Sequence, residues 1–172
     1  MKRFSLTISA SCALSIVVGA CAPARVAVQT PYDASQYATY KPTGLNAIRG
    51  QAFLTQQGGG VVTCAGKQVF LTPDSPYFRE LASIATHGST PEFPHGNGGP
   101  EDVVRHTVCD AQGNFEFTKL PDGKYILMTE VRWQVGYAAQ GGPIWMPGTV
   151  ADGVEKHVVM SNDAFVANRA SH

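Results

Sequence analysis

The chain has 172 residues, and its 13 Lys and Arg are balanced by 13 Asp and Glu. This balance excludes the clustered positive charge that nucleic-acid phosphates require, and it excludes a polybasic surface for an anionic membrane. The 18 glycines and 11 prolines favour many short strands joined by turns over long helices, in one domain with a normal core.

Residues 1–20 have the features of an export signal. Lys2 and Arg3 precede a moderately apolar run, residues 4–18, which is too short and too rich in Ser and Thr to remain in a bilayer as a spanning helix. The run ends in Val18-Gly-Ala-Cys21, which resembles the bacterial lipobox. The resemblance implies that the signal is removed and that Cys21 carries lipid on its sulfur and its amine. An ordinary signal peptide with a chance cysteine is the alternative.

The residue after Cys21 bears on where the protein resides. Position 22 is Ala rather than Asp, which in Gram-negative lipoproteins resembles export onward to the outer membrane. We therefore expect a membrane partner engaged through a lipid anchor at about 0.8 kcal/mol per buried methylene, with the domain facing the periplasm.

Residues 21–44 are predicted to be the lipidated N-terminus and a linker. This stretch contains Pro23, Pro31 and Pro42 and has no sustained helical or strand period, which predicts a mostly extended tether. Its tyrosines allow two interpretations, a strip that binds a partner or, as we favour, packing of some of them on the domain. They are Tyr32, Tyr37 and Tyr40.

From residue 45 the pattern changes to strand-like runs separated by turn residues. The longest run, residues 124–135, places Tyr125, Leu127, Thr129, Val131 and Trp133 on one face, as in a sheet with one wet side. We expect an all-β domain over residues 45–163, a seven-strand antiparallel Greek-key β-sandwich. A helix of one or two turns is expected over an open end, within 76–86, and residues 164–172 form a C-terminal tail. The expected strands are 47–55, 61–64, 67–72, 103–110, 114–118, 124–135 and 155–161.

One stretch has a specific spacing, Asp110-x-x-Gly-x-Phe-x-Phe-x-x-Leu-Pro-x-Gly-x-Tyr125. With the runs that begin at Ala47 and Val62, it resembles the carboxypeptidase regulatory-like family over roughly residues 46–160. The resemblance implies a transthyretin-like seven-strand sandwich that is generally a structural or binding unit without catalysis. The chain departs from that pattern by a long loop insert, residues 74–102, which the minimal module lacks.

Two cysteines remain in the domain once Cys12 leaves with the signal and Cys21 is lipidated. An even pair in an exported domain favours a disulfide between Cys64 and Cys109. Two buried free thiols or a metal-binding pair are the alternatives.

The insert and its flank hold His87, Glu92, His95 and His106, which could form a metal-dependent or carbohydrate-active site. No H-E-x-x-H spacing and no H-x-H pair occurs, so a Gly- and Pro-rich solvated loop is the favoured interpretation, with no metal and no cofactor. Nucleophile elbows, S-x-x-K pairs and phosphate-binding loops are also missing from the sequence, and we expect no enzymatic activity.

A flexible, glycine-rich loop is expected after the longest run, at residues 136–147, and it has the composition of a contact surface. The candidate ligand or partner surface comprises Tyr137, Trp145 and Met146, together with Tyr77 and Phe78 of the insert. Alternatively, Trp145 and Met146 fold back as a lid over the core, which we favour. The expected function is a non-enzymatic, lipid-anchored envelope module that binds an envelope protein or a carbohydrate. A structural subunit of a larger envelope complex is the other possibility.

Overall fold

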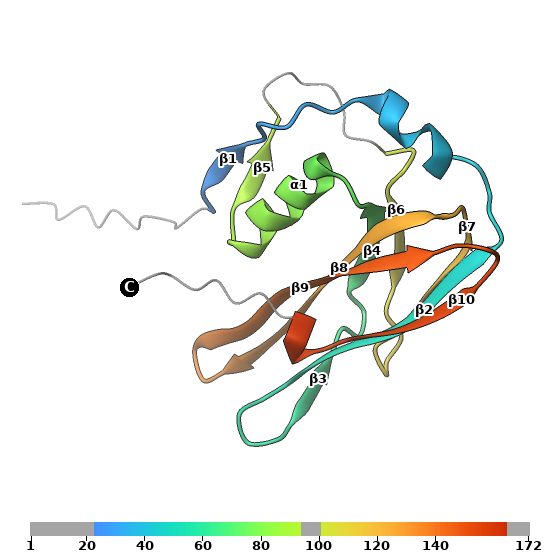
Figure 1. Ribbon diagram of the computed structural model, residues 1–172. Helices are drawn as coiled ribbons and strands as arrows, with labels where there is room; N and C mark the ends of the chain where they lie inside the picture. Colours follow the sequence, from blue (N-terminus) through green and yellow to red (C-terminus); the bar gives the residue numbers. More distant parts are fainter. Residues whose placement is uncertain (1–22, 94–100, 165–172) are drawn as a thin grey trace, which may run out of the picture.

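The computed structural model describes residues 23–93 and 101–164, and it confirms an all-β sandwich (Figure 1). Two sheets of four strands face each other, and a two-stranded sheet lies beside them. The elements are β1 (Arg25–Ala27), η1 (Ala34–Tyr40), β2 (Asn46–Thr55), β3 (Val61–Thr63), β4 (Gln68–Pro73), α1 (Pro76–Thr86), β5 (Thr90–Glu92), β6 (Arg105–Val108), β7 (Asn114–Leu120), β8 (Gly123–Val135), β9 (Ala138–Val150), β10 (Glu155–Met160) and η2 (Asn162–Ala164).

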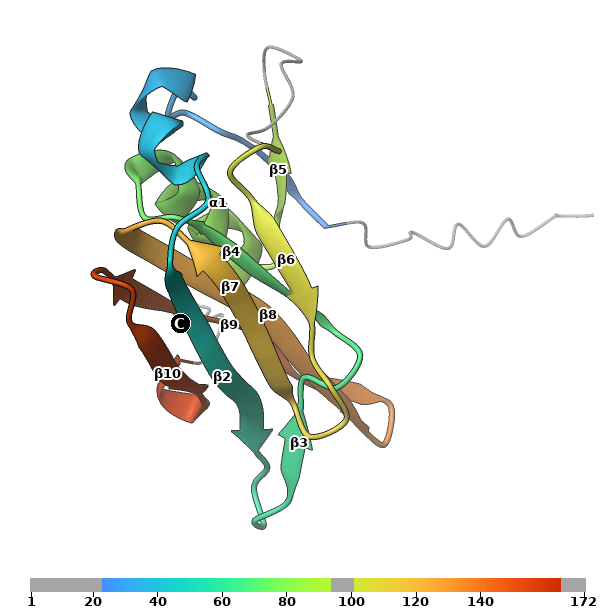
Figure 2. The same cartoon turned by 90° about the vertical axis from the view of Figure 1, so that its right-hand side faces the viewer.

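The first sheet is built around β2, which pairs with β10 and also with β7 and β3, and the second has the order β6-β4-β8-β9 (Figures 1 and 2). Both sheets are antiparallel except for the pairing of β2 with β10, which is parallel and places Lys156 beside Ile48. The expectation of a purely antiparallel sandwich is therefore wrong at this edge. The reason is that β10 enters the sheet at the end where β2 also begins.

The alternation along β8 places its odd-numbered residues in the core between the sheets. Leu127 and Val131 are fully buried there, and they belong to the same cluster as Ile48 and Leu54 of β2. Burial of such apolar side chains contributes roughly 1.5–3 kcal/mol each. The face assigned to β8 from its sequence is thus confirmed.

The predicted disulfide between Cys64 and Cys109 is present, with the two Cα atoms 5.8 Å apart. Cys64 lies between β3 and β4, and Cys109 lies between β6 and β7, so each cysteine lies where the chain crosses between the sheets. The backbone around the bond is tied together as well, since the Cys109 N–H donates to the Lys67 carbonyl oxygen at 2.9 Å. The bond therefore joins the two crossings at one end of the sandwich.

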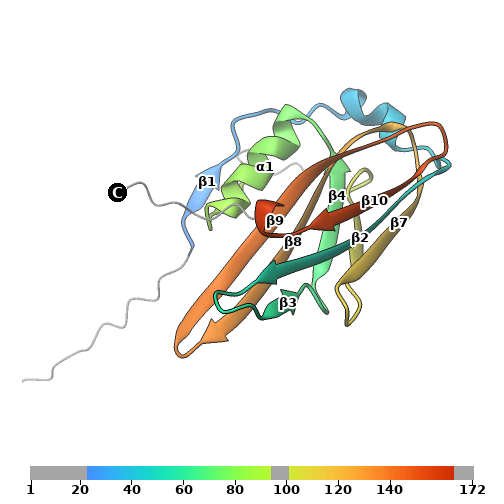
Figure 3. The same ribbon diagram turned by 60° about the horizontal axis from the view of Figure 1, so that its bottom comes forward.

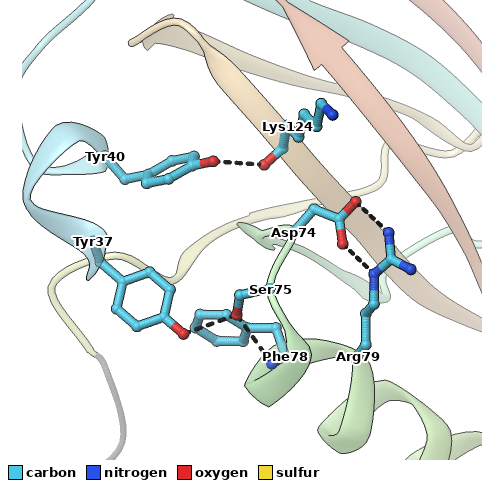
Figure 4. Close-up of polar contacts among 7 residues, drawn as sticks. All are labelled: Tyr37, Tyr40, Asp74, Ser75, Phe78, Arg79 and Lys124. Atoms are coloured by element: carbon cyan, nitrogen blue, oxygen red, sulfur yellow. Dashed lines mark hydrogen bonds and ion pairs between the residues drawn. The ribbon is translucent and has the colours of Figure 1, made fainter. Parts of the chain in front are cut away.

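A second, smaller core covers part of the outer face of the second sheet. There Ile126 of β8 packs with residues of α1 and of the segment before β2, including Val28 and Tyr37. Tyr37 is 2% exposed, and its hydroxyl lies 2.8 Å from Ser75 Oγ (Figure 4). The prediction of a mostly extended tether is thus wrong for residues 23–44, because Val28 and Tyr37 are buried on the domain. Packing of tyrosines on the domain is confirmed.

The insert begins with a helix of 11 residues, α1, which is longer than the predicted one or two turns. Ser75 caps its first turn, and Pro76 occupies a position where the missing N–H costs nothing. The helix lies on the outer face of the second sheet rather than over an open end (Figure 1). The buried stripe on α1 explains this position, because the exposed sheet face offers it an apolar partner.

An ion pair secures the start of α1. The Arg79 guanidinium donates to both carboxylate oxygens of Asp74, at 2.5 and 2.8 Å (Figure 4). This hydrogen bonding holds the pKa of the Asp74 carboxyl below its usual value. The described part of the insert thus forms α1 and β5 rather than the long loop that was expected.

Residues 136–147 do not form the expected loop either. They continue into β9, which pairs with β8 without interruption from Val135–Ala138 to Gly123–Val150. Within the described residues, no helix is long and apolar enough to cross a lipid bilayer.

Candidate functional site

The hairpin of β8 and β9 extends beyond the end of the sandwich (Figures 1 and 3). Each of these strands has 13 residues, whereas β2, the longest strand of the facing sheet, has 10. The inward face of β8 therefore continues past the packed core, as Trp133 and Val135. Val135 is 58% exposed, and Trp133 is partly buried against the core.

A cleft of about 670 Å³ occupies the space between this hairpin and the end of β2. Its volume is typical of small-molecule sites, which span ~300–1,000 Å³. We call it the end cleft. One wall is formed by the β8–β9 hairpin, and the other by the end of β2, the following turn and η2. The lining residues are Leu54, Thr55, Gln56, Gln57, Trp133, Val135, Ala139, Gln140, Gly141 and Asn162.

The indole of Trp133 is positioned by a glycine on the neighbouring strand. Gly141 has a φ of +79°, and a Cβ there would lie 2.7 Å from the Trp133 ring and would collide with the Val131 carbonyl oxygen. Gln140 is the direct cross-strand partner of Trp133. The hairpin thus places an aromatic face and an amide side by side.

The opposite wall is fixed by Asn162 of η2. Its Oδ1 accepts from the Thr55 N–H at 2.8 Å, and its Nδ2 donates to the Thr55 carbonyl oxygen at 3.4 Å. The side-chain amide thereby continues the hydrogen bonding of β2 beyond the end of β10. This contact holds β2 and η2 together where they line the cleft.

Among the described residues, none that lines the end cleft has an ionisable side chain. It offers one aromatic ring, several aliphatic groups, and the amides of Gln56, Gln57 and Gln140. Each amide can donate and accept hydrogen bonds at the same time. Such a surface suits an uncharged ligand that has both apolar patches and hydroxyl or amide groups.

Two other hollows among the described residues lie on the outer faces of the sheets. The larger, about 760 Å³, contains Arg49, whose guanidinium is 2.8 Å from Glu116 and 3.4 Å from Glu155. The smaller, about 350 Å³, includes Phe70 and the ion-paired Glu130 and Arg132. Most of the charged side chains in these hollows form ion pairs, which leaves few charged groups available to a ligand.

Most residues of the candidate surface predicted from the sequence are buried or partly buried. Tyr77 and Phe78 are 4% and 3% exposed in the second core, so their assignment to a ligand surface is wrong. Trp145 packs against the second core and Met146 against the main core, as the favoured lid interpretation held, although they do so from a strand. Tyr137, at the tip of the hairpin, is fully exposed and remains a candidate.

The histidines of the insert are not gathered within the described residues. His87 caps the end of α1, where its Nδ1 lies 2.7 Å from the Ser83 carbonyl oxygen, and His106 lies on β6 beside Phe70. No group of three His, Cys, Asp or Glu in the part of the chain that the structure describes could hold a metal ion. His95 and the predicted lipidation site Cys21 lie outside the described residues.

Sequence reasoning placed Trp133 on the inward face of β8 but did not identify it as a site residue. The signal in the sequence was the length of the inward-facing stripe of β8, which continues further than packing against the neighbouring strands requires. Gln56, Gln57 and Asn162 had no comparable signal, because their place at the cleft depends on how the two sheets end.

No protein-family model matches the sequence, and no curated protein matches it significantly. A solved structure from Pseudomonas aeruginosa, described as that of a candidate carbohydrate-binding protein, superposes with a TM-score of 0.63 at 22% identity. The match covers 77% of this chain and 99% of that one, and it establishes a shared fold. Catechol 1,2-dioxygenase from Pseudomonas arvilla C-1 matches over 87% of this chain and 61% of its own, at 11% identity, and its TM-score of 0.29 supports no argument.

Proposed function

We propose that this protein is a non-catalytic binding module that takes an uncharged carbohydrate in the end cleft. The observation that carries the proposal is the lining itself, in which Trp133 stands beside neutral amides and no ionisable group. A sugar ring has a C–H face that packs on an aromatic ring and hydroxyls at its edge that bind amides.

The shared fold with the candidate carbohydrate-binding protein of Pseudomonas aeruginosa supports the same ligand class. The lack of a general acid or base in the lining supports binding rather than turnover, because glycoside hydrolysis ordinarily uses two carboxyl groups. The resemblance to the carboxypeptidase regulatory-like family, whose modules are generally structural or binding units without catalysis, is part of the proposal.

The module is proposed to act in the cell envelope, anchored by lipid on Cys21. The lipobox-like Val18-Gly-Ala-Cys21 supports this, and Ala at position 22 supports delivery to the outer membrane. The disulfide between Cys64 and Cys109 fits an oxidising compartment outside the cytosol.

Carbohydrate binding is tested with the full chain carrying Cys21→Ser, by electrophoresis through gels that contain neutral polysaccharides. We expect retardation in at least one of them. Trp133→Ala should abolish it, because the variant removes the aromatic face. Gln134→Ala is the matched control, since this exposed neighbour points to the other side of β8. Free migration through every neutral polysaccharide, or equal retardation of Trp133→Ala, contradicts the proposal.

Anchoring is tested by replacing the acceptor sulfur. Cys21→Ser should abolish labelling by radioactive palmitate and should move the protein from the membrane fraction, because serine cannot form the thioether. The wild-type chain, labelled and fractionated in parallel, is the control. An unlabelled wild-type chain, or a labelled Cys21→Ser variant, would show that Cys21 is not the anchor.

A further inference from the structure

We infer that the end cleft binds an internal stretch of an extended, uncharged glycan chain rather than a single sugar or a chain end. This inference rests on the proposed function and specifies the ligand of the same site. It comes from the shape of the cleft, the order of its lining residues and the groups that would meet a charged sugar.

Each wall of the cleft includes a run of residues that is continuous in sequence. Leu54 to Gln57 follow one another along the first wall, and Ala139 to Gly141 follow one another along the second. Residues 139–141 belong to β9, and three consecutive residues of a strand span about 7 Å. A site whose contacts are spread along a line of this length offers more to a chain than to one ring.

The outer part of the cleft is exposed. Gln57, Val135 and Gln140 are all exposed, and among the described residues no other element lines the outer part of the cleft. Sugar hydroxyls in such a setting remain in competition with water, so one ring gains little free energy. Several rings in a row add aromatic and amide contacts without a new cost of association for each.

The lining also selects against charge. A uronic acid carboxylate in the cleft would lose part of its hydration, and none of the lining residues is a cation that could replace it. The charged side chains of this end of β8, Glu130 and Arg132, are paired with each other on its outer side. The inference therefore excludes acidic glycans as ligands.

The experiment measures binding by calorimetry and by tryptophan fluorescence with the Cys21→Ser chain. The probes are three neutral series, from glucose to cellohexaose, glucose to maltohexaose, and N-acetylglucosamine to its hexamer, with galacturonate oligomers as the charged comparison. For the series that binds, we expect affinity to rise at least roughly tenfold from the single sugar to the tetramer. Borohydride reduction of the terminal ring should leave the affinity of the hexamer unchanged, and high salt should not weaken it.

Equal affinity for the single sugar and the hexamer would overturn the inference and leave the proposed function standing. The same holds if galacturonate oligomers bind as tightly as the neutral ones, or if reduction of the chain end abolishes binding. If none of the three neutral series binds, both the inference and the proposed function fail.

The two walls provide a second check. Gln57→Ala and Gln140→Ala should each lower the affinity for the hexamer several-fold while leaving the melting temperature unchanged, because both side chains are exposed. Gln134→Ala is again the matched control. An unchanged hexamer affinity in both wall variants would contradict binding along the cleft.

Discussion

Asn46 is a buried side chain whose amide joins three segments of the chain. Its Nδ2 donates to the Leu120 carbonyl oxygen at 2.9 Å and to Asp122 Oδ1 at 2.8 Å, and its Oδ1 accepts from the Val154 N–H at 3.0 Å. It is 1% exposed. A single residue thus ties the start of β2 to the turn before β8 and to the turn before β10.

Replacing Asn46 by Ala should lower the free energy of unfolding by roughly 2–3 kcal/mol, because buried backbone groups lose their partner. The measurement is urea denaturation, with the slope expected to stay unchanged. Asn114→Ala is the control. It is exposed and bonds to Asp110, which keeps two backbone donors without it. A loss no larger than that of the control would contradict the role of Asn46.

Some features of the fold and of the candidate site could be predicted from the residue types alone, and others could not. The spacing from Asp110 to Tyr125 coincides with a turn in which Gly113 has a positive φ and with the buried Phe115 and Phe117, because turn glycines and alternating burial are local properties. Trp133 could be placed on a face but not in a cleft. Placing Trp133 in a cleft requires knowing where the facing sheet ends, and the sequence of a single strand does not contain that information.

At the scale of the elements, β9 shows why glycine and proline led to the wrong prediction of a loop. Pro143 and Pro147 suggested a loop, yet β9 is the last strand of its sheet. Proline is tolerated in an edge strand where its nitrogen faces away from the neighbouring strand. The same prolines leave fewer free N–H donors on the open edge, which disfavours pairing with another chain.

The segment before β2 was also misassigned, for a non-local reason. The segment has no sustained helical or strand period, but its apolar side chains complete a core with α1 and the outer face of the second sheet. Glu80 of α1 fastens this segment. Its carboxylate oxygens accept from the Gln29 and Thr30 N–H groups, each at 2.8 Å.

These hydrogen bonds lower the pKa of the Glu80 carboxyl from its ordinary value of 4.5. A lowered pKa in the folded chain means that the contribution to stability is complete above 4.5 and is lost as the pH falls through the folded value. Glu80→Gln should therefore reduce stability near neutral pH by about 1 kcal/mol, since the site is partly exposed to solvent, and should flatten the acid dependence.

Denaturation midpoints measured across the acid range check this prediction, together with amide exchange at Gln29 and Thr30. Glu101→Gln, which alters another exposed carboxylate of the insert, should leave the exchange of these two amides unchanged. Identical acid profiles for the wild type and Glu80→Gln would rule out the fastening role.

At the scale of the whole molecule, the disulfide and the end cleft lie at the same end of the sandwich, since the Cys64 N–H donates to the Ala52 carbonyl oxygen and Leu54 of the same strand lines the cleft. Sequence reasoning predicted seven of the strands and the disulfide, because strand alternation and an even pair of exported cysteines are strong signals. It could not predict the unequal lengths of the sheets, from which the cleft follows.

The double variant Cys64→Ser/Cys109→Ser should lose about 4 kcal/mol of stability in the chain-entropy model, given a separation of 45 residues. Guanidinium denaturation of the oxidised wild type and of the double variant gives the difference. The wild type under reducing conditions should match the double variant. If reduction leaves the midpoint where it was, the bond does not stabilise the fold.

The first strand, β1, begins at Arg25 and pairs with β5. Arg25 is only four positions after Cys21, and this stretch of chain can reach at most about 14 Å. A lipid on Cys21 would therefore tether the domain through only a few residues and hold it close to the lipid headgroups. A domain anchored in this way would reach only glycans that lie close to the membrane. Glycans further away than about one domain diameter would have to approach the membrane in order to bind.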